Sequence, residues 1–279
     1  MRIISWNVNG IRSMMSKLKD GTKKGSKTVN GINTLVDETK PDILCLQELK
    51  TQSRDDIQFL QSKFKYVLTN FSKVKKGYSG VALLCNEKPQ WVSYDFKMYD
   101  ETQIGEYNKY EWINEGRIIT ARFSKCIVIT AYVPNSKDDL LRIDERIAWE
   151  EIMRTYLKLL KDENTVPIIY VADHNVAPTD IDIYDKRNRD RVAGASKEER
   201  AEYIKLVDSG FINAFRHLHP TVRKYSYFSN FANSRQENKG WTIDHCMVSA
   251  NAKDKIVASD MLLDYFGSDH VPVLLDISP

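Results

Sequence analysis

The chain has 279 residues, of which 28% are charged and 42% hydrophobic, and its formal net charge is +3. This length is enough to bury a sizeable core, and the composition is ordinary for a soluble globular protein. The small net charge gives no reason by itself to expect a polyanionic partner. No apolar run reaches the roughly 18 residues of a membrane-spanning helix, which excludes that class.

The four cysteines lie far apart, and three of them fall inside apolar runs. This pattern is typical of buried, reduced thiols in an intracellular protein and gives no metal-type pairing. The first residues, Met1–Trp6, lack the apolar core of a signal peptide. We therefore expect an intracellular, soluble protein that acts as a monomer and has no membrane partner. No repeat or linker-like break appears, which predicts a single domain over residues 1–279.

Apolar runs of strand length recur through the first half of the chain. The expected strands cover residues 2–8, 42–48, 66–71, 80–85, 117–123 and 126–133, the last two forming a hairpin. Helical spacing after Ile32 ends at Lys40-Pro41. The lysine-rich segment 16–28 is interpreted either as a solvated loop or as a basic arm for a phosphate backbone. Residues 86–116 show no regular pattern.

The second half alternates helices and strands. A long helix is predicted from Asp138 and Asp139 to about Lys161, with an apolar stripe at helical spacing. The members of that stripe are Leu141, Ala148, Ile152, Tyr156 and Leu159. Ser196 and Glu199 form a capping box that opens the next helix. The apolar residues of this second helix are Ala201, Ile204 and Val207. Further strands are expected at 166–171, 225–231, 240–248 and 271–277. This mixture predicts an α/β protein with two sheets covered by helices.

Polar side chains follow most of the predicted strands, at the point where each strand ends. They are Asn7, Asn9, Gln47, Glu48, Tyr132, Asn135, Asp173, Asn175, Asp244, His245, Asp269 and His270. Binding sites in α/β sheets gather at such ends. Carboxylate and amide oxygens suit Mg²⁺, or Mn²⁺ as a substitute, and not zinc. An added Asp and His pair could activate water for attack on phosphorus.

The segment Ser268-Asp269-His270 first suggests a serine hydrolase. Consecutive residues cannot form a catalytic triad, because alternate side chains of an extended segment point in opposite directions. A Gly-x-Ser-x-Gly elbow is also absent from the sequence. Ser268 is therefore predicted to be a turn or capping residue. A catalytically inactive DNA-binding scaffold is disfavoured because the polar set is intact.

The ordered motifs resemble those of exonuclease III-type apurinic/apyrimidinic endonucleases, in the endonuclease/exonuclease/phosphatase superfamily. The matching stretches run nearly end to end. They are Ser5-Trp6-Asn7-Val8-Asn9-Gly10-Ile11-Arg12, Cys45-Leu46-Gln47-Glu48, Gly77-Tyr78-Ser79-Gly80-Val81-Ala82, Ala131-Tyr132-Val133-Pro134-Asn135-Ser136, Asp173-His174-Asn175-Val176-Ala177, Phe215-Arg216-His217, Gly240-Trp241-Thr242-Ile243-Asp244 and Gly267-Ser268-Asp269-His270.

The resemblance implies a four-layered α/β sandwich, with two mixed β-sheets packed together and flanked by helices. It implies Mg²⁺-dependent hydrolysis of the phosphodiester 5′ to an abasic site in duplex DNA, leaving a 3′-hydroxyl. Removal of blocked 3′ ends and some 3′-5′ exonuclease activity are also implied. The alternative is another branch of the superfamily, such as a non-specific nuclease or a phosphoinositide phosphatase.

By position, Glu48 and Asp269 would hold the metal, helped by Asn7 or Asn9. Asp173 and Asn175 are further candidate ligands, and each has a second implied role. Asp173 would move the proton of the attacking water or of the leaving oxygen, and Asn175 would orient that water and the phosphate.

The remaining implied roles concern the phosphate and the abasic sugar. Tyr132 and His270 would contact the scissile phosphate, and Asp244 would fix the tautomer of His270. Asn135 would also contact DNA phosphate. The family flips the baseless sugar into an apolar pocket. The aromatic residues at the matching positions are Phe228, Phe231 and Trp241.

Two departures from the family pattern concern charge. Asn9 stands where some relatives have Asp, which removes one possible metal charge. Asp138 stands where some relatives place an Arg that inserts into DNA, so we expect that wedge to be missing.

Overall fold

The computed structural model describes residues 1–19, 31–96, 109–185, 187, 189–230 and 233–278. Within them, twelve strands form two six-stranded sheets. Because β1 pairs with β2 in parallel and β7 with β8 in parallel, while the other pairs are antiparallel, both sheets are mixed.

The first sheet has the strand order β11-β12-β1-β2-β4-β3. Its strands are β1 (Arg2–Asn7), β2 (Ile43–Gln47), β3 (Tyr66–Asn70), β4 (Val81–Cys85), β11 (Ile256–Met261) and β12 (Val273–Ile277). The second sheet has the order β5-β6-β7-β8-β10-β9. Its strands are β5 (Trp91–Ser93), β6 (Ile118–Arg122), β7 (Ile127–Tyr132), β8 (Ile168–Asp173), β9 (Phe211–Asn213) and β10 (Asp244–Ser249).

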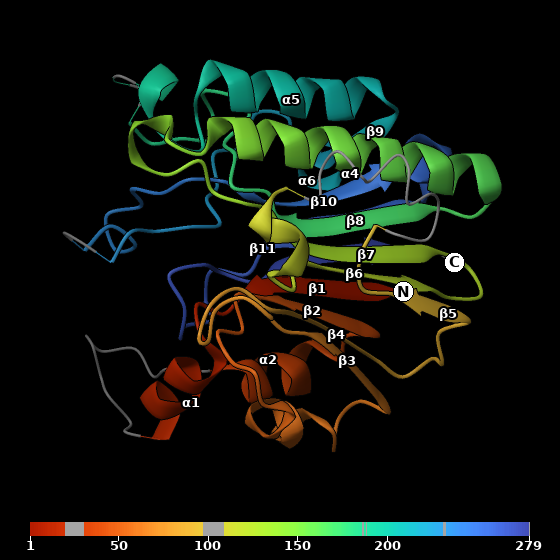
Figure 1. Cartoon of the computed structure of the whole chain (residues 1–279). Coiled ribbons are helices and arrows are strands. Elements are labelled where there is room, and N and C mark those ends of the chain that lie inside the picture. Colours follow the sequence, from red (N-terminus) through yellow and green to blue (C-terminus); the bar gives the residue numbers. More distant parts are fainter. Residues whose placement is uncertain (20–30, 97–108, 186, 188, 231–232, 279) are drawn as a thin grey trace.

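Helices cover the outer face of each sheet, as Figure 1 shows. Beside the first sheet lie α1 (Ile11–Lys19), α2 (Ile32–Thr39) and the 3₁₀ helix η1 (Arg54–Leu60). Beside the second sheet lie α4 (Ile143–Glu163) and α5 (Lys197–Asp208). The short α6 (Ala214–Leu218) follows β9 directly. Four 3₁₀ helices lie in connections: η3 (Glu111–Asn114), η4 (Asp138–Leu140), η5 (Arg189–Arg191) and η6 (Ala250–Lys255).

Three apolar layers hold the structure together. One lies between the sheets, and includes Cys45, Val128 and Cys246. The second lies between the second sheet and α4 and α5, and the third between the first sheet and α1, α2 and η1. Strands β1, β2, β4 and β8 are buried on both faces, which explains why their sequences are continuous apolar runs. The predicted four-layered sandwich is confirmed.

The four cysteines are all free and buried, as predicted. The predicted hairpin is confirmed as β6 and β7. The capping box of α5 is also present, since Ser196 Oγ accepts from the Glu199 N–H and the Glu199 side chain returns to the Ser196 N–H. No described helix is both long and apolar enough to cross a membrane.

The predicted inner faces of the two long helices were wrong in part. Leu141 is 81% exposed and precedes α4, which begins only at Ile143. On α5 the predicted apolar stripe faces outward: Ala201, Ile204 and Val207 are exposed. The side that faces inward carries Glu199, Glu202, Tyr203 and Leu206. Here buried ion pairs and hydrogen bonds satisfy acidic side chains at positions that a hydrophobic pattern assigns to solvent.

Three further regions also differ from the sequence predictions. Of the strand predicted at 225–231, the described residues 225–230 form no named strand, and Tyr227 instead makes isolated bridges to Trp241 and His270. The strand expected at 240–248 begins only at Asp244. The region 86–116 contains β5 and η3 among its described residues. Most of segment 16–28 lies outside the described residues, although α1 covers its first four positions.

Candidate active site

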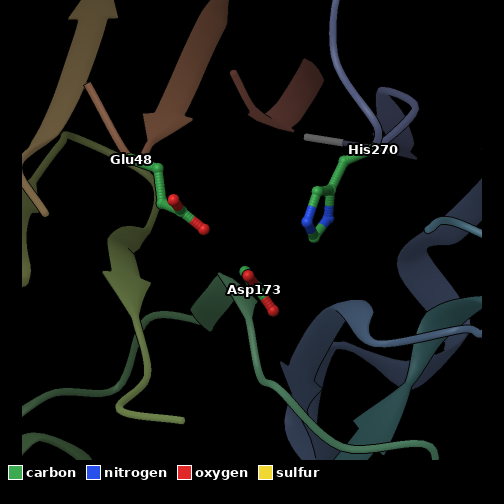
Figure 2. Close-up of side chains that lie close together, drawn as sticks. All are labelled: Glu48, Asp173 and His270. Carbon is green, nitrogen blue, oxygen red and sulfur yellow. The ribbon is translucent and has the colours of Figure 1, made fainter. Parts of the chain in front are cut away.

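Topology brings the predicted strand-end residues to one edge of the sandwich. In the first sheet Asn7 lies opposite Gln47 at the ends of parallel β1 and β2. In the second sheet Tyr132 lies opposite Asp173 at the ends of parallel β7 and β8. Asp244 begins antiparallel β10 and also lies opposite Asp173. Figure 2 shows the side chains of Glu48, Asp173 and His270 pointing toward a common space.

The backbone turns sharply just after three of these strands. Asn9, Glu48 and Asn175 have left-handed backbone conformations, with φ values of 45°, 53° and 48°. This conformation is unfavourable for residues with a Cβ atom, although Asn tolerates it better than most. Such strain concentrates at functional sites, where surrounding contacts hold it in place.

Asn7 connects the two sheets. Its Nδ2 donates to Glu48 Oε1 at 2.8 Å and to Asp173 Oδ2 at 2.8 Å. Its Oδ1 accepts from the Asn9 N–H at 3.0 Å. The amide therefore fixes the spacing between a carboxylate of the first sheet and one of the second.

Asp269 is held by Asn9, and Ser268 fixes the turn on which Asp269 lies. Asn9 Nδ2 lies 2.9 Å from both carboxylate oxygens of Asp269. Ser268 Oγ donates to the Asn7 carbonyl at 2.7 Å and accepts from the His270 N–H at 3.2 Å. This confirms Ser268 as a turn residue and gives its hydroxyl a structural partner in place of a catalytic base.

His270 is paired with a buried carboxylate. Its Nδ1 lies 2.9 Å from Asp244 Oδ2, and the same oxygen accepts from Ser226 Oγ at 2.6 Å. Burial alone lowers the pKa of His270, but the Asp244 charge and hydrogen bond outweigh it and raise the pKa to about 10. The ring is therefore an imidazolium at neutral pH, and Nε2–H is the donor that remains for a ligand.

The pKa values of the two carboxylates bridged by Asn7 are shifted in opposite directions. Burial, together with the Asp244 charge, raises the pKa of Asp173 to about 7. Burial would also raise the pKa of Glu48, but Lys50 and the Asn7 hydrogen bond lower it below its ordinary value. Glu48 is thus ionised, whereas Asp173 can gain or lose a proton near neutral pH. Such a separation of pKa values is what proton transfer and charge binding require of neighbouring carboxylates.

A second set of contacts joins the ends of β7 and β8. Asn135 Nδ2 donates to Asn175 Oδ1 at 3.0 Å, and Asn175 Nδ2 donates to the Val133 carbonyl at 2.9 Å. The Arg117 guanidinium stacks on the Tyr132 ring, 4.6 Å from its centroid. Burial raises the pKa of the Tyr132 hydroxyl well above its ordinary value, so this group stays a proton donor.

The model of the endonuclease/exonuclease/phosphatase family matches residues 4–270. The chain belongs to that family. The predicted resemblance is confirmed. An exodeoxyribonuclease of Bacillus subtilis (strain 168) is 36% identical over 279 residues and is covered completely, as is this chain. The zebrafish (Danio rerio) DNA repair nuclease APEX1 is 34% identical, over 99% of this chain and 81% of that protein.

Solved structures agree on the fold. An AP endonuclease from Leishmania major superposes with a TM-score of 0.83 at 24% identity, over all of this chain and 88% of that one. A 3′-5′ exonuclease from Neisseria meningitidis superposes with a TM-score of 0.79 at 23% identity over the whole of both chains. At this identity the likeness concerns the sandwich and its strand order alone.

In this member of the family, two carboxylates and an imidazolium from three separated segments converge. Side-chain atoms of Glu48, Asp173 and His270 all lie within 4.8 Å of one another. The Lys50 ammonium lies 2.7 Å from Glu48 Oε2 and also contacts Asn9 Oδ1. The Lys50 ammonium thus already binds Glu48 and Asn9, two residues whose side-chain oxygens were predicted to be metal ligands. The donor set of carboxylate and amide oxygens fits a hard divalent ion.

The aromatic residues predicted to form a sugar pocket have different surroundings. Phe228 is only 3% exposed and belongs to the apolar layer between the sheets. Trp241 is partly buried and packs with Tyr227 on a small separate cluster. Phe231 lies outside the described residues.

The sequence interpretation missed three residues of the site. Lys50 contacts Glu48 and lies two residues after it, a short spacing that could have drawn attention to it. Ser226 binds Asp244, and Arg117 stacks on Tyr132. Neither Ser226 nor Arg117 belongs to a quoted motif, and only tertiary packing brings them to the site.

Proposed function

We propose that this chain is a Mg²⁺-dependent DNA repair nuclease that cleaves the phosphodiester 5′ to an abasic site in duplex DNA and leaves a 3′-hydroxyl. Blocked 3′ ends and 3′ termini are further substrates. The observation that carries the proposal is the convergence of an ionised Glu48, a titratable Asp173 and a cationic His270. The relatives named as exodeoxyribonuclease and DNA repair nuclease support the choice of DNA.

Glu48 and Asp269 are proposed to hold Mg²⁺, with Asn7 and Asn9 positioning both carboxylates. Asp173 and Asn175 are further candidate ligands. When bound, the ion supplies positive charge to the phosphate and to the leaving oxygen. The four buried free cysteines support an intracellular setting, and the protein is proposed to act as a monomer.

The protein's own groups would share the remaining work. His270 and Tyr132 donate hydrogen bonds to the phosphate oxygens, which gain charge as the bond breaks. Asp173 accepts the proton of the attacking water, because its pKa of about 7 matches the working pH. Asn175, anchored by Val133 and Asn135, orients that water.

A duplex with one tetrahydrofuran abasic analogue tests the proposal against an undamaged duplex of the same sequence. We expect incision of the first at the 5′ side of the analogue, with a 3′ end that a DNA polymerase extends. Equal cleavage of both duplexes would favour a non-specific nuclease of the same family. Absence of cleavage with Mg²⁺ present would overturn the proposal. A His270→Ala variant that keeps the full rate would overturn the residue roles.

A further inference from the structure

Two fully buried charged residues lie behind the site, in the helical layer of the second sheet. Arg146 on α4 and Glu199 at the start of α5 are each 1% exposed. The sequence did not single out Arg146 and identified Glu199 only as part of the capping box of α5, and neither residue contacts the carboxylate cluster. Each instead binds one of the two loops that carry the proposed catalytic residues.

Arg146 holds the loop that follows β8. Its Nη2 donates to the His174 carbonyl at 2.7 Å, and its Nη1 pairs with Glu150 one turn along α4. His174 is flanked in sequence by Asp173 and Asn175. The guanidinium therefore fixes the peptide that joins the proposed base to the residue that orients the water.

Glu199 holds the loop that follows β7. It accepts from Ser136 Oγ at 2.8 Å and from the Gly194 N–H at 2.8 Å. Ser136 directly follows Asn135, whose amide binds Asn175. Both loops are thus tied to the helical layer, and Asn175 is the point where they meet.

Asn175 needs such support because its backbone is left-handed, with φ at 48°. A conformation of this kind costs about 1 kcal/mol or more and persists only where other contacts determine it. The helix-side contacts have a cost of their own. Among the described residues, the buried Arg146 Nε and His174 Nε2 lack a hydrogen-bond partner. A buried ion pair is also weak evidence for stability.

We propose that Arg146 is a positioning residue, which acts through the His174 carbonyl to hold Asn175 in its catalytic orientation. The inference rests on the proposed function, since it assigns Asn175 to the attacking water. In this role Arg146 would differ from a residue that merely stabilises the helical layer. A purely structural role predicts a lower melting temperature and an unchanged turnover of the folded protein.

The chain offers a matched control in Arg154. This residue also lies on α4 and pairs with buried Glu202 of α5, but it contacts neither catalytic loop. The variants to compare are Arg146→Lys, Arg146→Gln, Arg154→Lys and Arg154→Gln. Each variant is assayed for incision of the tetrahydrofuran duplex well below its own melting temperature, so that it is folded during the assay. If only one of the two Arg146 variants folds, that variant is enough for the test. The readouts are kcat, KM and Tm.

We expect the Arg146 variants to lose kcat by roughly tenfold or more while KM changes less than about threefold. The Arg154 variants should lower Tm by a similar amount and leave kcat within about twofold. In an Asn175→Ala background, adding Arg146→Lys should lower kcat by less than about a further threefold, because both changes remove the same function.

A full kcat in the folded Arg146 variants would overturn the inference. So would an Arg146→Lys loss that is equally large in the Asn175→Ala background. Failure of the proposed function gives a different result, because the wild-type protein would then leave the duplex uncut. An Asn175→Ala variant that cuts the duplex at the unaltered rate would instead overturn the role of Asn175.

Discussion

Replacing Asp244 by Asn should remove the positive charge of His270. The Nδ1–Oδ2 distance of 2.9 Å and the burial of both side chains make this the strongest charge contact of the imidazole. Together with the charges of Asp173 and Asp269, this contact outweighs the effect of burial and raises the pKa of His270 from 6.5 to about 10. Since one pKa unit corresponds to about 1.4 kcal/mol, it favours the imidazolium by several kcal/mol. Without the Asp244 carboxylate, burial is opposed only by the weaker charges of Asp173 and Asp269, and the pKa of His270 should fall from about 10 toward its ordinary value.

The expected loss of rate is smaller than the loss of ionic stabilisation. Removing one preorganised donor to a developing oxyanion costs about 3 kcal/mol, or a factor of roughly 100 in kcat. The assay is single-turnover incision of the tetrahydrofuran duplex across about pH 6 to pH 10. On the alkaline side, wild-type activity should fall only near pH 10, as His270 deprotonates, and on the acid side it should fall below about pH 7, as Asp173 gains a proton. The Asp244→Asn variant should be nearly inactive over most of this range.

The folding stability of the protein should depend on pH through the same Asp244–His270 pair. Because the folded-state pKa of His270 lies above its unfolded value, the stabilisation is complete below about pH 6.5 and is lost as the pH rises through about 10. Asp260→Asn is the control, since this carboxylate pairs with Lys224 away from the site. An Asp244→Asn variant within about threefold of the wild-type rate, with an unmoved alkaline limb, would refute the reasoning.

Three further changes give distinct readouts. Asp173→Asn should abolish incision yet raise Tm at about pH 8, because a folded-state pKa raised to about 7 means that stability is lost as the pH rises from 3.8 through 7; a lower Tm there would contradict this sign. Lys50→Met should tighten Mg²⁺ binding by about tenfold in calorimetry, because the ammonium competes for Glu48; weaker binding would show that Lys50 does not compete. Gly116→Ala should destabilise the fold by about 3 kcal/mol or more in urea unfolding, because φ is +65° and the new Cβ would lie 2.4 Å from the Phe71 carbonyl carbon; a neutral change would contradict this steric estimate.

The sequence predicted the sandwich because the buried strands are continuous apolar runs that end in polar residues. It predicted a common site for Asn7, Glu48, Asp173 and His270, since polar residues at strand ends form binding sites in α/β sheets, and these side chains do lie together. The motif order supplied the family, which the family match confirms.

The sequence could not predict which helical face is buried where charges are paired inside. On α5, Glu202 faces the core because Arg154 reaches it from α4, and the apolar Ile204 is left outside. Hydrophobic periodicity contains no information about such a partner on another helix. The same limit applies to Arg146, whose role depends on a carbonyl that is distant in sequence. Left-handed backbone at Glu48 is likewise set by tertiary contacts and not by residue type.

The most direct test of the central claim is the metal dependence of incision at a single abasic analogue. Protein stripped with EDTA should bind the tetrahydrofuran duplex but leave it uncut. Adding Mg²⁺ should restore cleavage, and the product should carry a 3′-hydroxyl at the 5′ side of the analogue. Cleavage that continues at the full rate in EDTA would contradict the account. So would a stripped protein that Mg²⁺ and Mn²⁺ both fail to reactivate while its fold is intact.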